Sequence, residues 1–126
     1  MTGARNLLAA LDAFGVHWQP HRVASVDDHE VKVVKVLGEF VWHSHPESDE
    51  LFLVLAGELT VDLREDGVER AVVLGPHDVL VVPSGVEHRP RAAVETAVVL
   101  VEREGTVNTG DAGGELTSPV RELPDV

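Results

Sequence analysis

The chain has 126 residues, no cysteine, and 22 acidic against 10 basic residues, a net charge of -12 with histidines neutral. This length suits one domain with its own core. The lack of cysteine excludes disulfides, thiolate catalysis and cysteine-based metal sites. The negative charge disfavours nucleic acid and anionic membranes as partners. No apolar run has membrane-spanning length and the start shows no signal-peptide pattern, so we expect a soluble, cytoplasmic protein.

Valine dominates the apolar part of the sequence. The chain contains 24 valines, but its aromatic residues are only two tryptophans and three phenylalanines. Side chains branched at Cβ fit a pleated, half-buried surface better than a helix. The valines also occur in short runs that are separated by Gly, Pro or Asp clusters. We therefore predict an all-β fold, a small jelly-roll barrel with a short N-terminal helix, whose sheet closes on itself.

A helical pattern is confined to the first 14 residues. Leu7, Leu11 and Phe14 lie at positions i, i+4 and i+7, which form one apolar stripe, and Gly15 follows where a helix commonly ends. We expect this short helix to pack against the outside of the barrel.

Extended segments and turns follow from residue 16 onward. Glu58–Leu63 alternates between polar and apolar residues, whereas Glu50–Ala56 is almost wholly apolar and is expected to be buried on both faces. Lys32 and Lys35 are expected to reach solvent. The predicted strands are Val16–Ser25, Val31–Leu37, Glu39–His45, Glu50–Ala56, Glu58–Leu63, Val68–Leu74, Val79–Val82 and Ala92–Glu102.

The composition changes near residue 105. We assign residues 1–104 to the barrel domain and its helix. Residues 105–126 contain four glycines and two prolines with little periodicity, which is typical of a solvated tail. The alternative is an ordered arm, for which Val107, Leu116 and Val120 offer apolar anchors.

Three histidines and one glutamate have a spacing that suggests chemistry. His43 and His45 are two residues apart at the end of a predicted strand, so both imidazoles face the same side of the sheet. A turn then returns the chain to Glu50, and His88 follows a Pro-Ser-Gly corner further along. Imidazole and carboxylate together suit one divalent transition metal ion, such as Zn, Fe, Ni or Mn. The plain alternative is that these histidines are surface or core residues brought together by chance.

Two stretches of the sequence resemble the motifs of the cupin superfamily. His43–Glu50, followed by six residues and Gly57, is similar to the first cupin motif, and Pro83–His88 is similar to the second. The spacing to Gly57 favours Glu50 over the neighbouring Asp49 as the carboxylate. The resemblance implies a small β-barrel, most like the cupins described as mannose-6-phosphate isomerase-like, and it implies four metal ligands: His43, His45, Glu50 and His88.

Four further residues are candidates for substrate binding. Trp42 and Phe52 are either core residues or a platform for a ligand. Arg89 and Arg91 either hold an anionic substrate at the mouth of the barrel or lie at a solvated strand edge that balances nearby acids.

Three functions are compatible with this pattern. The first is a metal-dependent enzyme, of isomerase or dioxygenase type, that acts on a small polar molecule such as a sugar, a keto acid or a catechol-like compound. The second is a module that binds or senses a small molecule without turnover, and the third is a structural protein with a vestigial site. A phosphosugar site needs cations, and the chain has only two lysines. Cupins of this size commonly form homodimers, so the resemblance also implies a homodimer.

Overall fold

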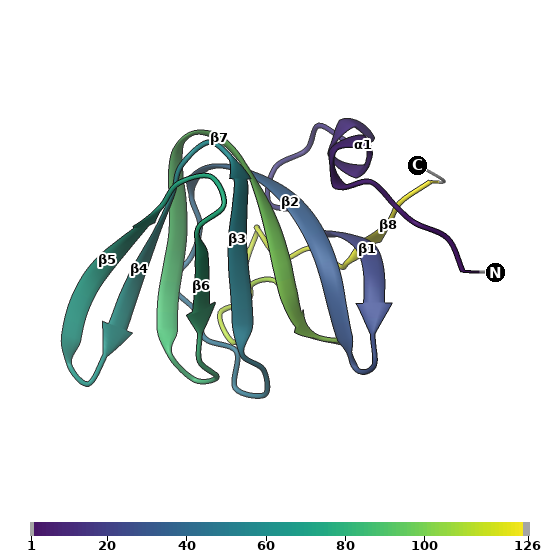
Figure 1. The fold of residues 1–126 in the computed structure, drawn as a ribbon. Coiled ribbons are helices and arrows are strands. Elements are labelled where there is room, and N and C mark those ends of the chain that lie inside the picture. The colour runs from purple at the N-terminus through teal and green to yellow at the C-terminus, as the bar shows by residue number, and fades with distance from the viewer. Residues whose placement is uncertain (1, 125–126) are drawn as a thin grey trace.

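The computed structural model describes residues 2–124 and consists mainly of β-strands (Figure 1). Within this range no helix is long and apolar enough to cross a membrane. The elements are α1 (Leu7–Asp12), β1 (His21–Val26), β2 (His29–Glu39), β3 (Glu50–Ala56), β4 (Leu59–Glu65), β5 (Val68–Leu74), β6 (Val79–Val82), β7 (Glu87–Arg103) and β8 (Arg121–Glu122).

The strands form two layers that pack face to face, and strand β7 contributes to both. Its first residues pair with β4, and its later residues lie between β2 and β3. The main strand order is β5-β4-β7-β2-β1-β8, with β3 joining β7 to β6. The predicted all-β class and the short N-terminal helix are confirmed. The prediction that the sheet closes was wrong, because β5 pairs only with β4 and β6 only with β3 among the described residues.

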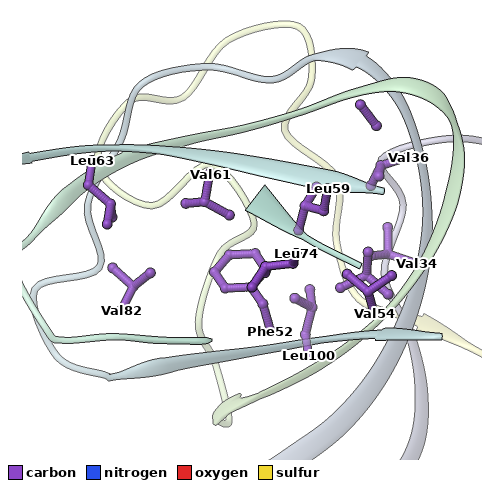
Figure 2. Packing of buried hydrophobic residues seen from close by; sticks show 12 residues of the cluster. Val34, Val36, Phe52, Val54, Leu59, Val61, Leu63, Leu74, Val82 and Leu100 are labelled. Carbon is purple, nitrogen blue, oxygen red and sulfur yellow. The ribbon is translucent and has the colours of Figure 1, made fainter. Parts of the chain in front are cut away.

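The main hydrophobic core fills the space between the layers. Strands β2, β3 and β6 contribute from one side and β4 and β5 from the other, and Figure 2 shows the Phe52 ring among these side chains. Full burial of one such side chain stabilises a fold by about 1.5–3 kcal/mol. We therefore expect this core to keep the sheet folded in the metal-free protein. Its buried members are Val34, Val36, Phe52, Val54, Leu59, Val61, Leu63, Leu74, Val82, Ala92, Val98 and Leu100.

Helix α1 covers part of the outer face of the sheet. The Asn6 side chain caps the helix by accepting a hydrogen bond from the Ala9 amide at 3.0 Å. Leu11 is buried in a second apolar cluster, and the Phe14 ring stacks on His21 with 3.7 Å between ring centroids. The expected apolar stripe therefore packs against the sheet as predicted.

Two local expectations were wrong. Residues 40–49 are irregular rather than a strand, with one isolated bridge between His43 and His88. Lys32 is 1% exposed instead of solvated, because it shares a strand face with Val34 and Val36, which point into the core. Its ammonium group donates a hydrogen bond to Glu102, with 2.8 Å between Nζ and Oε1.

The segment after β7 is an ordered arm as far as residue 124. It ends in β8, which pairs with β1 in parallel, and Figure 1 shows it in yellow beside that strand. Of the three apolar anchors expected, Val107 is exposed and Leu116 and Val120 are only partly buried; the arm is held by Leu123, which is buried in the second apolar cluster, and by polar contacts. The Asn108 amide donates to the Trp18 and Leu116 carbonyls, and Thr109 is fully buried.

The tight approach at Gly57 yields a test of the fold. Gly57 has a φ of 93°, and an added Cβ would lie 2.4 Å from Thr96 Oγ1 and 2.9 Å from the Glu95 carbonyl. Gly38 also has a positive φ of 83°, but open space surrounds it. We expect Gly38→Ala to lower the free energy of unfolding by about 1 kcal/mol and Gly57→Ala by about 3 kcal/mol, as measured by urea denaturation. Equal losses would show that the contact with Thr96 is unimportant.

Candidate metal centre

His43, His45, Glu50 and His88 converge in the interior of the protein. All four are buried, and one ligand atom from each lies within 4.8 Å of the others. The two residues of the His-Ser-His segment come from the irregular stretch between β2 and β3, Glu50 begins β3, and His88 lies near the start of β7. The fold therefore brings together the four residues that the sequence singled out.

Backbone hydrogen bonds fix the irregular segment against β7. His43 and His88 exchange both of their backbone hydrogen bonds, with N–O distances of 3.0 and 2.8 Å. The Gly85 amide donates to the His45 carbonyl at 3.0 Å. The corner at residues 83–85 thus places His88 beside the first two histidines, although more than 40 residues separate them in sequence.

Two of the imidazole rings are oriented by carbonyl groups. The Nδ1 atom of His43 lies 2.8 Å from the Val41 carbonyl oxygen, and that of His88 lies 2.9 Å from the Val86 carbonyl oxygen. Because a carbonyl oxygen only accepts, both Nδ1 atoms carry the proton. In the neutral rings the Nε2 atom is then a lone-pair donor, which is the form that binds a metal.

The carboxylate of Glu50 faces these rings at short distance. Its Oε1 lies 2.9 Å from His88 Nε2 and 3.3 Å from His45 Nε2. The His45 contact lacks hydrogen-bond geometry, so this buried Nε2 has no hydrogen-bond partner. A lone pair that faces a carboxylate is repelled unless a proton or a cation lies between them. The donor set and its unpartnered nitrogen therefore fit a divalent cation.

The pKa values of His43 and Glu50 are lowered, whereas that of His88 is raised. Burial and the neighbouring His88 ring lower the pKa of His43 to about 4. Burial alone would raise the pKa of Glu50, but the contacts with His45 and His88 outweigh it and hold that pKa well below its usual range. Burial opposes protonation of His88, yet the Glu50 carboxylate raises its pKa. The site thus keeps a negative carboxylate beside at least one neutral ring.

A buried charge network adjoins the group. Lys32 Nζ lies 2.8 Å from Glu102 Oε1 and 3.9 Å from Glu30 Oε1, and Arg22 pairs with Glu30 from the surface. Burial and the charge of Glu50 raise the pKa of Glu102, while the Lys32 ammonium group opposes that rise. Sequence reasoning missed this network. The alternation of side chains along the strand could have predicted the burial of Lys32, because it places Lys32 on the same face as buried valines.

Two cavities flank the metal-ligand group. The first is mostly apolar, measures about 40 Å³, and is bounded by His43 and Glu50 together with Phe52 and with Asn108 of the arm. The second measures about 190 Å³ and lies between His45 and the start of the arm. Of the four residues predicted to bind substrate, Phe52 therefore lines the first cavity. The remaining residues that line the first cavity are Trp18, Pro20, Val34, Val36, Phe40, Leu59, Pro90, Val98 and Leu100.

The other three predicted substrate-binding residues do not line this cavity. Arg89 and Arg91 both donate to the Asp62 carboxylate, at distances between 2.9 and 3.2 Å. Trp42 stacks under the Arg64 guanidinium, 3.8 Å from the ring centroid. Both arginines alternate with the inward residues His88 and Pro90 along β7, so they occupy the opposite face of the strand. They form a salt-bridge cluster there, and the idea that they hold a substrate is not supported.

The sequence matches the Cupin_2 family, whose description is "Cupin domain", over residues 34–102. The uncharacterized protein YdbB of Bacillus subtilis is 38% identical over 104 residues, which cover 82% of this chain and 89% of that protein. The chain therefore belongs to the Cupin_2 family. It is also 29% identical over 69 residues to a 3-hydroxyanthranilate 3,4-dioxygenase of Xanthomonas euvesicatoria, a match that covers 55% of this chain and 39% of the dioxygenase.

Solved structures agree with this assignment. The crystal structure of a cupin-2 domain protein from Shewanella frigidimarina has a TM-score of 0.74 and 36% identity, covering 79% of this chain and 94% of that one. A hydroquinone 1,2-dioxygenase from Sphingomonas with bound 4-hydroxybenzoate has a TM-score of 0.66 at 18% identity, covering 79% and 73%. The second likeness shows a shared fold alone.

The Asp62 cluster leads to a prediction about pH. Burial opposes ionisation of Asp62, but hydrogen bonds from Arg91 and Arg89 lower its pKa. The folded-state pKa is thus below the unfolded value of about 3.9, so the stabilisation is complete above that pH and is lost as the pH falls through the folded pKa. We expect Asp62→Asn to be less stable than the wild type by about 1 kcal/mol at pH 7, after allowance for solvent screening.

Urea denaturation from pH 7 down to pH 2.5 measures this difference. The difference between wild type and Asp62→Asn should shrink below pH 4. The control is Asp12→Asn, at an exposed carboxylate in α1, which should leave stability nearly unchanged. A difference that stays constant at all pH values would contradict the ion-pair explanation.

Proposed function

We propose that this cupin is a metal-dependent enzyme that acts on a small, uncharged molecule, with one divalent transition metal ion held by His43, His45, Glu50 and His88. The observation that carries the proposal is the buried convergence of three imidazoles on one carboxylate. Such a charge is costly to bury without a compensating cation. A structural role explains the site less well, because a proton on His88 can compensate Glu50 but leaves the buried His45 Nε2 without a partner.

The residues around a bound ion would have different roles. Val41 and Val86 hold the His43 and His88 rings with Nε2 facing inward, and Glu50 neutralises part of the metal charge. A bound ion supplies Lewis-acid or redox chemistry at the coordination positions that four protein ligands leave open. The apolar cavity beside His43 and Glu50 excludes bulk water from that point and is where we place the substrate.

The cavity favours a dioxygenase-type reaction over a phosphosugar isomerase. No Lys or Arg is among the described residues that line it, and phosphate recognition depends on such cations. Arg89 and Arg91 are already bound to Asp62. A dioxygenase is also among the relatives of the chain, at 29% identity. These observations therefore support a dioxygenase-type reaction better than the isomerase activity suggested by the resemblance to mannose-6-phosphate isomerase-like cupins.

The size of the cavity sets a condition on the substrate. An engineered cavity that binds benzene measures about 150 Å³, whereas this one measures about 40 Å³. A ligand with a ring therefore does not fit wholly inside this space, and part of it would lie in the open mouth of the cavity. The alternative function is a module that binds a small molecule at the same metal without turnover, and the same condition applies to its ligand.

Metal analysis tests the ligand assignment. Each substitution to Ala at His43, His45, Glu50 or His88 should lower the metal content of the dialysed protein several-fold, because each removes one donor. Asp49→Ala is the control, since the Asp49 carboxylate is bound to the Ser84 amide instead. Elemental analysis measures the ratio of metal to protein. Full metal occupancy in His88→Ala would refute the assignment.

Oxygen consumption tests the reaction type. The Fe²⁺-loaded protein should consume one O₂ for each molecule of catechol or hydroquinone that disappears, as measured with an oxygen electrode and by absorbance. His88→Ala is the matched control and should be inactive. Reversible binding of these phenols without turnover would support the binding module instead, and isomerisation of mannose 6-phosphate would contradict the proposed reaction class.

A further inference from the structure

The C-terminal arm holds the residue that lies between the two histidines of the first motif. The Ser44 amide donates to Asp111 Oδ1 at 2.9 Å, and the Ser44 hydroxyl donates to Asp111 Oδ2 at 3.2 Å. The Asp111 amide in turn donates to the Ser44 carbonyl at 3.1 Å. One arm residue thus satisfies the amide, the carbonyl and the hydroxyl of Ser44.

A glycine allows the arm to come this close. Gly110 has a φ of 53°, and an added Cβ would lie 2.1 Å from the Ser44 carbonyl oxygen and 3.1 Å from His45 Nδ1. The arm backbone is therefore in contact with the segment that carries the candidate ligands. A larger side chain at this position would displace either the arm or the segment that carries the candidate ligands.

The arm is itself firmly attached to the rest of the fold. Asn108 donates to the carbonyls of Trp18 and Leu116 and accepts from the Ser118 amide. The hydroxyls of Thr109 and Thr117 are 2.7 Å apart. Asp111 is consequently presented from a fixed support, as a residue must be if it is to hold another in place.

The segment that carries His43 and His45 needs such support. It lies outside any strand, and β7 fixes it from one side through the paired backbones of His43 and His88. On the side of the arm, the hydrogen bonds of Ser44 run to Asp111. Rotation of the Ser44 peptide groups would turn both neighbouring imidazoles away from Glu50.

We propose that the arm is part of the metal centre, with Asp111 as a positioning residue that holds Ser44 and thereby keeps His43 and His45 aimed at the metal. The proposal rests on the proposed function, because it requires these histidines to be ligands. The arm lies outside the residues that match the cupin family, 34–102. Loss of a group that orients a metal ligand typically weakens metal binding by about 10–100-fold.

Cobalt titration tests the role of Asp111. Co²⁺ is the probe because its visible absorption reports both binding and coordination geometry. Asp111→Ala should raise the Co²⁺ dissociation constant about tenfold or more and change the absorption spectrum. Glu115→Ala removes the same charge from an exposed position on the same arm and should leave both unchanged. Asp111→Asn keeps an oxygen for the Ser44 amide and should restore most of the affinity.

A glycine pair gives an independent test. Gly110→Ala should weaken Co²⁺ binding as Asp111→Ala does, because the new methyl group pushes the arm away from Ser44. Gly113 also has a positive φ, 65°, but open space around it. Gly113→Ala therefore controls for backbone strain and should bind Co²⁺ like the wild type.

The outcomes separate this proposal from the one on which it rests. All titrations are made at a temperature at which circular dichroism shows each metal-free variant to be folded. An unchanged dissociation constant and spectrum in Asp111→Ala, even with a lower melting temperature, would overturn the positioning role and leave a structural one. Equal Co²⁺ binding by wild type and His88→Ala would instead overturn the ligand assignment itself.

Discussion

The carboxylate of Glu50 is buried among three imidazole rings, and a charge in that position is stable only when a proton or a cation compensates it. The Val41 and Val86 carbonyl groups accept the Nδ1 protons of His43 and His88, so the Nε2 atoms of both rings face inward, and His88 Nε2 carries a proton when it hydrogen-bonds to the carboxylate. A metal ion can replace that proton and also give the unpartnered His45 Nε2 a partner. The carbonyl groups that orient the His43 and His88 rings serve the same requirement.

The fold separates stability from chemistry. The twelve-residue core lies between the layers and contains none of the candidate ligands. The candidate ligands are placed at the points where β7 meets the irregular segment and β3. Because β7 belongs to both layers, it fixes His88 relative to the other ligands. The arm fixes the same segment from another side through Asp111 and Ser44. The site is thereby supported by elements distant in sequence.

Much of the fold and of the candidate site was predictable from local patterns. Short valine-rich runs bounded by turn residues identified most strands, and the motif spacing identified four residues that the fold does bring together. The failures concern long-range pairing. Arg89 and Arg91 belong to Asp62, which is 27 and 29 residues away, and no local pattern reveals such a partner. The burial of Lys32 likewise depends on Glu102, 70 residues further along. The contact between Asp111 and Ser44 could not be predicted for the same reason, because the two residues are far apart in sequence.

A crystal structure of the metal-loaded protein, with anomalous scattering recorded at the absorption edge of the metal, tests the central claim most directly. We expect one strong anomalous peak bonded to the Nε2 atoms of His43, His45 and His88 and to the carboxylate of Glu50. A peak elsewhere on the chain, or none between these residues in protein shown to contain metal, would contradict the metal centre and the functions built on it.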